Sequence, residues 1–196
     1  MLKVGITGGI GSGKTTVSEV FSSLGISIYS ADERARSITA TDPEVQKEII
    51  SLFGGELFNS DNELNRSKLA ELVFNDSESL ENLNHIIHPR VRADFTNWVA
   101  EQTSEYIIKE AAILIENGAH KELDALILVT ADRDQRIERV MKRDGVERES
   151  VIQRMNNQLD DKDKKEYATY TINNNNDQLV IQQVLEIHED LISKAS

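Results

Sequence analysis

The chain has 196 residues, no cysteine and a formal net charge of -12 at pH 7. The lack of cysteine excludes disulfides, thiolate metal sites and cysteine nucleophiles, and the negative charge, spread along the chain, disfavours binding to nucleic-acid phosphates. The start has no signal-peptide pattern and no apolar stretch approaches the roughly 20 residues of a membrane span, so we expect a cytoplasmic protein without nucleic-acid or membrane partners.

The chain begins with a predicted strand, turn and helix. Residues 2–7 have the composition of a strand, and the glycine-rich residues 8–13 separate them from a segment with helical spacing. Gly25 is a typical helix stop. The apolar face of this helix consists of Val17, Val20, Phe21 and Leu24.

Four more predicted strands follow, alternating with helices. This alternation favours an α/β fold in which helices cover both faces of a five-stranded parallel sheet. The final helix carries an apolar face that includes Val184 and Leu191. The four strands are expected within residues 26–32, 106–111, 125–130 and 168–172.

Two helical segments interrupt the alternation. Residues 33–102 contain three or four amphipathic helical patterns without a strand, and we expect Pro89 to begin one of them. Residues 132–165 form a second, arginine-rich helical segment. We therefore expect a core made of residues 1–32, 103–131 and 166–196, a helical insertion at 33–102 and a lid at 132–165.

The glycine-rich stretch matches the phosphate-binding pattern G-x-x-x-x-G-K-[ST] and lies between a strand and a helix, as a P-loop requires. Its glycines let backbone N–H groups turn toward a phosphate, Lys14 adds a positive charge, and Thr15 offers a hydroxyl to Mg2+. A tight turn without a ligand is the alternative. The predicted nucleotide-binding residues are Gly8, Gly9, Ile10, Gly11, Ser12, Gly13, Lys14, Thr15 and Thr16.

The rest of the sequence narrows the class of P-loop protein. GTP-binding switches need N-K-x-D after a later strand, and this chain has TADRDQ at residues 130–135 instead. A small-molecule kinase needs a phosphate cradle, an acceptor pocket and cations that close over the transferring group. The two helical segments are candidates for the pocket and the cations, so the sequence favours an ATP- and Mg2+-dependent kinase within a P-loop three-layer sandwich.

Asp32 follows the second predicted strand. Ligands of open α/β sheets bind beyond the carboxyl ends of the strands, so we expect this carboxylate to face the phosphates. There it could accept the proton of an acceptor hydroxyl. The alternative is that Asp32 caps the following helix.

Several stretches together resemble the bacterial dephospho-CoA kinase family along essentially the whole chain. The resemblance implies transfer of the γ-phosphoryl of ATP to the ribose 3'-hydroxyl of dephospho-CoA, the last step of coenzyme A synthesis. The stretches that carry it are TGGIGSGKTT, ADERAR, the HP pair at His88 and Pro89, LIENG, RVMKRDG and TINNNN.

The resemblance also implies roles for individual residues. Asp32 matches the general base, and Arg36, Arg66 and His88 match the coenzyme-binding segment. For His88 a buried helix-start histidine bonded to backbone is equally open. Glu110 lies where the family often has aspartate and could hold a Mg2+ water; a plain charge at a strand end is the alternative.

The arginine-rich segment matches the family's lid. Arg139 and Arg143, four residues apart on one helical face, match its phosphate-binding arginines, with Arg154 as a weaker member. Guanidinium groups suit this role because they bind phosphate oxygens bidentately and stay charged. The alternative is an exposed helix with Arg–Glu pairs made by Glu138, Glu147 and Glu149.

Besides Glu110, four positions depart from the family pattern. Ser30 replaces an aspartate before Ala31, and Ala112 replaces a proline. Asn173 and Asn176 replace an aspartate and a glycine in the loop that borders adenine in the family, where Asn174 is expected to bind the nucleotide. Asparagine tolerates the left-handed backbone, so we expect the turn to persist.

Two other functions remain open at this stage. A nucleoside monophosphate kinase would share the core, insertion and lid, but its acceptor is a phosphate and needs no base. A P-loop switch module would hydrolyse ATP slowly and expose a large apolar patch. For the kinase we expect small-molecule substrates and a monomer or weak oligomer.

Overall fold

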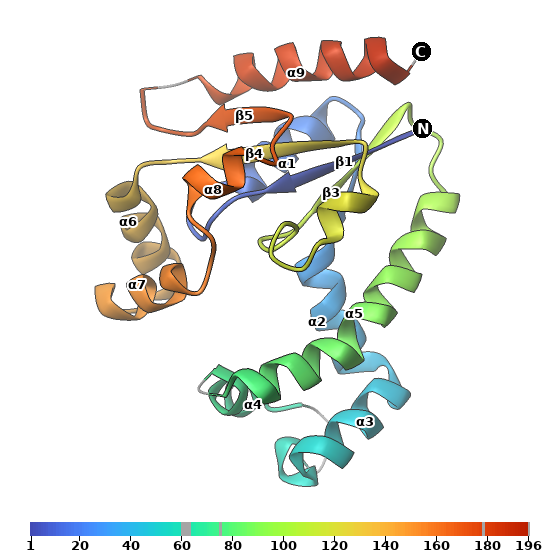
Figure 1. Cartoon of the computed structure of the whole chain (residues 1–196), viewed down its shortest axis with the longest axis vertical. Coiled ribbons are helices and arrows are strands. Elements are labelled where there is room, and N and C mark those ends of the chain that lie inside the picture. The colour runs from blue at the N-terminus through green and yellow to red at the C-terminus, as the bar shows by residue number, and fades with distance from the viewer. Residues whose placement is uncertain (60–63, 75, 178, 196) are drawn as a thin grey trace. The chain divides into compact units, whose positions relative to one another are not determined.

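The computed structural model describes two compact units of the chain. One consists of Met1–Ser30 and Gln102–Ser196, and the other of Ala31–Glu101. Figure 1 colours the chain from its N-terminus to its C-terminus. The sheet-forming unit is thus interrupted once, directly after its second strand, and contains the arginine-rich residues 132–165. The described residues are 1–59, 64–74, 76–177 and 179–195.

The first unit is built on a five-stranded sheet. Its strand order is β2-β3-β1-β4-β5, and all neighbouring strands are parallel. The predicted α/β fold class with a five-stranded parallel sheet is confirmed. The strands are β1 (Leu2–Thr7), β2 (Ser27–Ser30), β3 (Tyr106–Glu110), β4 (Ala125–Thr130) and β5 (Tyr170–Asn173).

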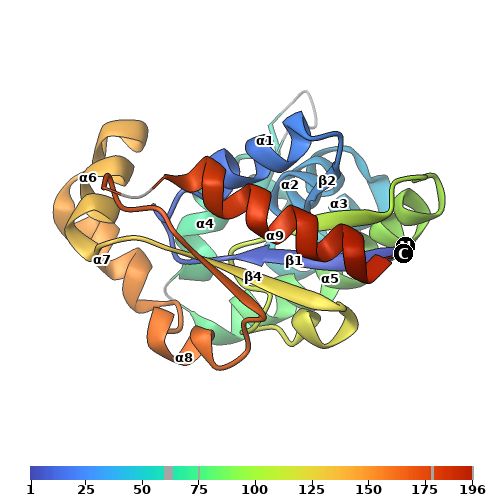
Figure 2. The ribbon, with the colours of Figure 1, turned by 90° about the horizontal axis from the view of Figure 1, so that it is seen from above.

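Two helices cover one face of this sheet. The helices α1 (Lys14–Ser23) and α9 (Val180–Ala195) lie side by side over it (Figures 1 and 2), because their apolar stripes pack against the strands. Phe21 of α1 and Leu191 of α9 are fully buried in this core, as helical periodicity predicts. Four short elements complete the unit: η2 (Ala119–Glu122), α6 (Arg133–Asp144), α7 (Arg148–Asn156) and α8 (Asp161–Lys165).

The second unit is helical and has its own core. Asp42 caps one of its helices by accepting the N–H groups of Glu44 and Val45. The core side chains are Val45, Ile49, Leu57, Leu69, Val73, Leu83 and Ile86. Its elements are α2 (Ala31–Thr41), α3 (Pro43–Phe53), η1 (Gly55–Leu57), α4 (Arg66–Phe74) and α5 (Ser77–Ala100).

Pro89 does not begin a helix, so that prediction is wrong. The helix α5 starts at Ser77, where Asp76 caps it by accepting the N–H groups of Glu78 and Ser79, and Pro89 lies inside it. The HP pair misled the sequence argument because proline favours the first helical turn. Here the capping residue Asp76, thirteen residues before Pro89, decides where the helix begins.

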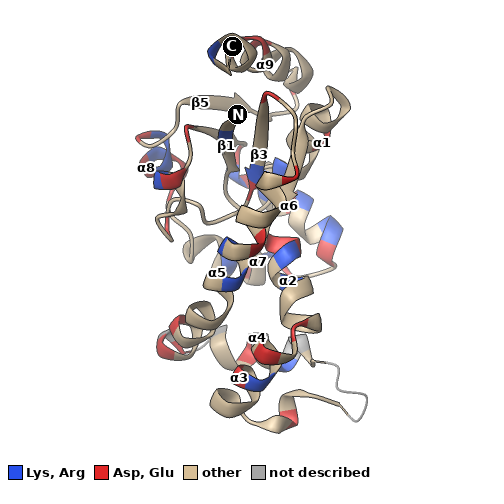
Figure 3. Cartoon of the chain, turned by 90° about the vertical axis from the view of Figure 1, so that its right-hand side faces the viewer, with Lys and Arg blue, Asp and Glu red and all other residues tan. Residues whose placement is uncertain are grey.

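Charged residues of both signs are mixed along the helices. Figure 3 shows Lys and Arg beside Asp and Glu on α2, α3, α5 and α6. The expectation that the protein does not bind nucleic acid stays a prediction. Among the described residues, no helix is both long enough and apolar enough to cross a membrane.

Candidate active site

The glycine-rich turn forms a phosphate-loop geometry between β1 and α1. The backbone takes positive φ values at Gly11 (78°) and Gly13 (91°), and Gly13 is the N-cap residue of α1. A Cβ on Gly13 would overlap the side-chain amide of Asn174. Both the backbone and the neighbours therefore require glycine here, for the reason that the motif predicts.

Lys14 and the first turn of α1 provide positive charge at this turn. The Lys14 ammonium donates to the Gly8 carbonyl oxygen at 2.9 Å, so its side chain folds over the loop. Thr15 and Thr16 are exposed in the same helical turn. Ser12 is buried, and its hydroxyl makes no hydrogen bond with the described residues. A lysine above the free N–H groups of a helix start is a site for an anion such as a phosphate.

Ser30 and Glu110 meet at the carboxyl edge of the sheet. The strand register places Glu110 beside Ile6 of β1 and beside Ser30 of β2. The Ser30 hydroxyl donates to Glu110 Oε2 at 3.3 Å, and Glu110 is only 8% exposed. Serine at position 30 therefore has a structural partner in the glutamate. This edge is where ligands of open α/β sheets bind.

Asp32 lies in the first turn of α2, which opens the second unit. Because α2 begins at Ala31, Asp32 is inside the helix and not at the residue that precedes it. Asp32 therefore does not hold the N-cap position that the helix-cap alternative requires, although the helix dipole favours a carboxylate in this first turn. Its placement opposite the phosphates stays a prediction.

The predicted coenzyme-binding residues all lie in the second unit. Arg36 is exposed on α2, and the side chain of Arg66, at the start of α4, lies outside the described residues. His88 is exposed within α5, so the alternative of a buried helix-start histidine is wrong. Contact of these residues with a coenzyme stays a prediction.

Arg139 of α6 reaches the asparagine run and the edge of the phosphate loop. Its Nη2 donates to the Asn174 carbonyl oxygen at 2.9 Å and to Asn176 Oδ1 at 3.2 Å. Its Nη1 is buried and has no hydrogen-bond partner among the described residues. A Cβ on Gly13 would lie 3.9 Å from this Nη1. The structure thus brings one predicted lid arginine to the loop.

Arg143 and Arg154 both bind Asp144. Arg143 Nε lies 2.6 Å from Asp144 Oδ1, and Arg154 Nη1 lies 2.8 Å from Asp144 Oδ2. These two guanidinium groups hold the pKa of the Asp144 carboxyl well below its usual range. Asp144 in turn raises the pKa of Arg143. Throughout residues 132–165, all of which are described, the ion pairs of the arginines are with aspartates and not with the glutamates considered above.

The asparagine run is held against the phosphate loop. Asn174 Nδ2 donates to the Ser12 carbonyl oxygen at 2.8 Å, and its backbone N–H donates to Thr130 O at 2.8 Å. Asn173 Oδ1 accepts the N–H of Asn175 at 3.0 Å, which tightens the turn. The asparagines at 173 and 176 therefore make specific hydrogen bonds and do not merely tolerate the turn.

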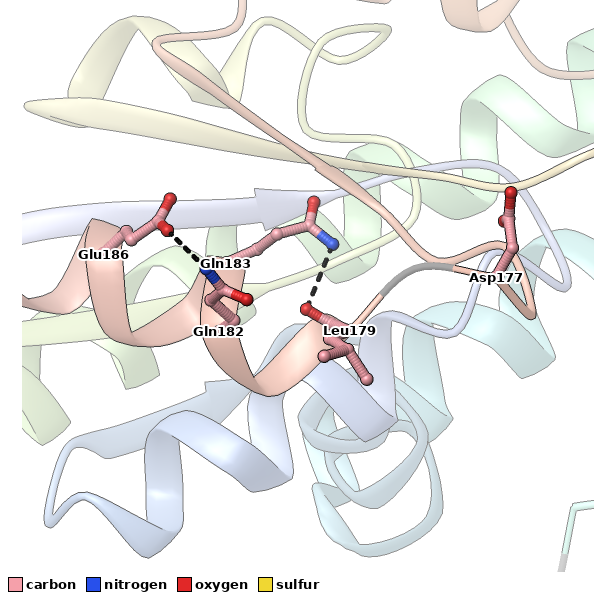
Figure 4. A pocket seen from close by; sticks show the side chains of 5 residues that line it. All are labelled: Asp177, Leu179, Gln182, Gln183 and Glu186. Carbon is pink, nitrogen blue, oxygen red and sulfur yellow. Dashed lines mark hydrogen bonds between the residues drawn. The ribbon is translucent and has the colours of Figure 1, made fainter.

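A pocket of about 330 Å³ lies beside this run, at the start of α9 (Figure 4). Gln183, which lines it, also exchanges two hydrogen bonds with the backbone of Asn173, at 2.8 and 2.9 Å. The pocket thus borders the turn that meets the phosphate loop. Its lining residues are Asp177, Leu179, Gln182, Gln183 and Glu186.

Sequence reasoning missed three residues at this site. Arg136, Gln158 and Asp144 contact the loop or its arginines. Asp144 lies in the RVMKRDG stretch but was given no role, and the other two belong to no motif. For Arg136 a signal was present, because it lies three and seven residues before the two predicted lid arginines and so shares their helix face. Gln158 gave no such signal, since its partner Ile10 is distant along the chain, and the RVMKRDG stretch did not show that Asp144 pairs with two arginines.

The oxygen atoms at this edge suit a magnesium ion. Among the described residues, no group of three or more His, Asp or Glu side chains gathers around one point. Mg2+ bound with nucleotides needs only one or two protein oxygens, because water and phosphates complete its shell. The exposed hydroxyl of Thr15 and the carboxylate of Glu110 therefore fit such an ion.

Comparisons with known proteins agree with this arrangement. The family model described as dephospho-CoA kinase matches residues 2–179. A dephospho-CoA kinase of Bacteroides fragilis is 40% identical over 98% of this chain and 94% of that protein. The solved dephospho-CoA kinase of Campylobacter jejuni is 26% identical, with a TM-score of 0.71 over 99% of this chain and 98% of that chain. The structure of TT1252 from Thermus thermophilus is 29% identical, with a TM-score of 0.86 over 100% and 98%.

Proposed function

The chain belongs to the dephospho-CoA kinase family, whose members phosphorylate dephospho-CoA with ATP in coenzyme A biosynthesis, and from this premise we propose which residues carry the reaction. The observation that carries the proposal is the phosphate loop, where Lys14, the start of α1 and Arg139 converge on one turn. These groups can neutralise a polyphosphate in a chain whose overall charge would repel one.

The phosphate loop binds ATP, and Lys14 bridges its β- and γ-phosphates. The hydrogen bond from Lys14 to the Gly8 carbonyl supports this role, because it holds the ammonium over the loop before the nucleotide arrives. Asp32 accepts the proton of the ribose 3'-hydroxyl as that oxygen attacks the γ-phosphorus in line. The transfer is direct, so no phosphoenzyme forms.

Thr15 would hold Mg2+ directly and Glu110 would hold one of its water molecules. When bound, the ion neutralises phosphate charge and orients the transferring group. The buried Ser30–Glu110 hydrogen bond supports the indirect role, since it fixes the carboxylate at the sheet edge.

The lid arginines neutralise charge on the moving phosphoryl group. Arg139 is already close to the loop, whereas Arg143 and Arg154 are held by Asp144. Phosphate oxygens can replace that carboxylate, because guanidinium binds both with the same two-pronged geometry. Asn174 and the neighbouring turn border the base of the nucleotide.

One assay separates this function from its alternatives. Purified protein is given ATP and Mg2+ with dephospho-CoA, with each nucleoside monophosphate, or without acceptor, and ADP release is measured. We expect release at least about 100-fold faster with dephospho-CoA than with any other addition, because the proposed coenzyme-binding residues hold only this acceptor with its ribose 3'-hydroxyl at Asp32. A nucleoside monophosphate as the best acceptor would indicate the related kinase class, and slow acceptor-independent release would indicate a switch module. The cytoplasmic location and the monomeric or weakly oligomeric state stay predictions.

A further inference from the structure

Ile10, in the middle of the phosphate loop, contacts the arginine-rich segment through its N–H, its carbonyl oxygen and its side chain. Its N–H donates to Gln158 Oε1 at 2.8 Å, and its carbonyl oxygen accepts from Arg136 Nε at 2.9 Å. Its side chain packs on the apolar cluster of α6 and α7. The buried members of that cluster are Ile137, Val140 and Val151.

Arg136 is buried where it contacts both the phosphate loop and α8. Its side chain is only 10% exposed, and its Nη1 pairs with Asp161 Oδ2 of α8 at 3.1 Å. A Cβ on Gly9 would overlap the guanidinium, and a Cβ on Gly11 would overlap the backbone of Arg136. The loop on both sides of Ile10 is therefore in direct contact with residue 136.

These contacts link the loop to Arg139. Arg136 and Arg139 are three residues apart on α6, so the anchor at Ile10 also sets how far the Arg139 guanidinium lies from Gly13. The loop around Ile10 is rich in glycine, and a glycine-rich turn without such contacts samples many conformations. Holding one residue of it, Ile10, by both its backbone N–H and its backbone carbonyl removes much of that freedom before the nucleotide binds, which improves affinity.

We propose that Arg136 and Gln158 are positioning residues. They hold the backbone N–H and carbonyl of Ile10 and thereby keep the phosphate loop and Arg139 in the positions that bind ATP. They act through Ile10 and do not touch the nucleotide themselves. The inference rests on the proposed ATP site at the phosphate loop.

The test uses the full chain and measures the Kd of Mg-ATP by titration calorimetry, together with kcat and both KM values. Arg136→Met keeps the length of the side chain but removes the donor to Ile10, and Gln158→Leu removes the acceptor. We expect each to raise the Kd and KM of ATP about tenfold while the KM of dephospho-CoA stays within twofold. Arg136→Lys keeps one donor and is expected to recover about a third of the loss on a logarithmic scale.

The matched controls are Arg133→Met and Gln153→Leu, which remove exposed side chains of the same types from α6 and α7. Both should leave the Kd of ATP within twofold of the native value. Melting temperatures are recorded for all variants, because a merely structural role would lower them without changing the Kd at temperatures well below the transition. If Arg136→Met does not fold, Gln158→Leu decides.

Lys14→Ala distinguishes a failure of the proposed ATP site from a failure of the positioning role of Arg136 and Gln158. If native protein binds ATP and Lys14→Ala does not, the site stands, and unchanged Kd values for both positioning variants would overturn this inference alone. If Lys14→Ala binds ATP as tightly as the native protein, the proposed site itself is wrong, and so is the inference that rests on it.

Discussion

Asp32 is the residue on which the proposed chemistry depends. Replacing it by asparagine keeps its size and one accepting oxygen but removes the negative charge and the proton acceptor. We expect Asp32→Asn to lower kcat by about 10²- to 10⁴-fold, the usual contribution of a general base, while the Kd of ATP stays within twofold. ADP release and calorimetric titration measure the two quantities.

The control for this variant is Glu33→Gln, which changes the exposed neighbouring carboxylate on α2. It should leave both quantities nearly unchanged. Turnover of Asp32→Asn close to that of the native protein would remove Asp32 from the role of base.

Asp144 gives a prediction about pH. Its pKa is lower in the folded protein because of Arg143 and Arg154. A depressed carboxyl pKa adds stability that is present above the unfolded value of about 4 and is lost as the pH falls below it. Its side chain is 24% exposed and Arg143 is 62% exposed, so we expect a contribution of at most about 1 kcal/mol.

Urea unfolding of native protein and of Asp144→Asn measures this contribution. The difference in unfolding free energy should be larger at pH 7 than at about pH 3. The matched control is Asp134→Asn, because Asp134 also pairs with an arginine of this segment but is 78% exposed. A difference for Asp144→Asn that grows as the pH falls would contradict the assigned cause.

At the scale of elements, α8 is tied to the segment after β3 by a buried ion pair. Lys164 is fully buried, its ammonium lies 2.9 Å from Glu116 Oε1, and Nζ makes no hydrogen bond with the described residues. Glu116→Gln would leave the buried ammonium without a counter-charge. We expect a loss of about 3 kcal/mol in unfolding free energy at pH 7, measured by denaturant titration.

The matched control for this pair lies at the surface. Glu48 pairs with Arg90 at 3.2 Å, and both side chains are more than 40% exposed. Glu48→Gln should cost at most about 1 kcal/mol, because water screens such pairs. Equal losses for the two variants would show that burial does not decide the strength of the α8 contact.

The elements also show where sequence reasoning succeeds. The strands and the first and last helices were predicted from the spacing of apolar residues. This prediction succeeds because each element buries its apolar face in the core. The start of α5 was predicted wrongly, since Pro89 is a local signal that the Asp76 cap and the rest of the helix overrule. When two residues of one segment both signal a helix start, the packing of the helix is needed to decide which of them begins it.

At the scale of the whole molecule, the excess of acidic residues gives a prediction. The chain has 34 Asp and Glu against 22 Lys and Arg, so the folded state carries net self-repulsion. Raising NaCl from about 10 mM to about 200 mM shortens the screening length from about 30 to below about 10 Å. We expect the melting temperature to rise by roughly 2–4 °C for each kcal/mol of repulsion removed.

Calorimetry in NaCl and in choline chloride measures this effect and separates screening from specific cation binding. Sulfate and phosphate are avoided because they could bind the phosphate loop. A melting temperature that falls with salt would mean that local ion pairs outweigh the net repulsion.

The sheet, the phosphate loop and the family could be predicted from the amino-acid sequence, because they depend on residues close together in the chain or on motifs in a fixed order. Which side chains contact the loop became known from the folded chain. Arg136 and Gln158 lie 126 and 148 residues from Ile10, and Asn174 lies 162 residues from Ser12. Such contacts depend on how α6, α7 and the end of β5 pack against β1 and α1, and no local pattern of residues encodes that packing.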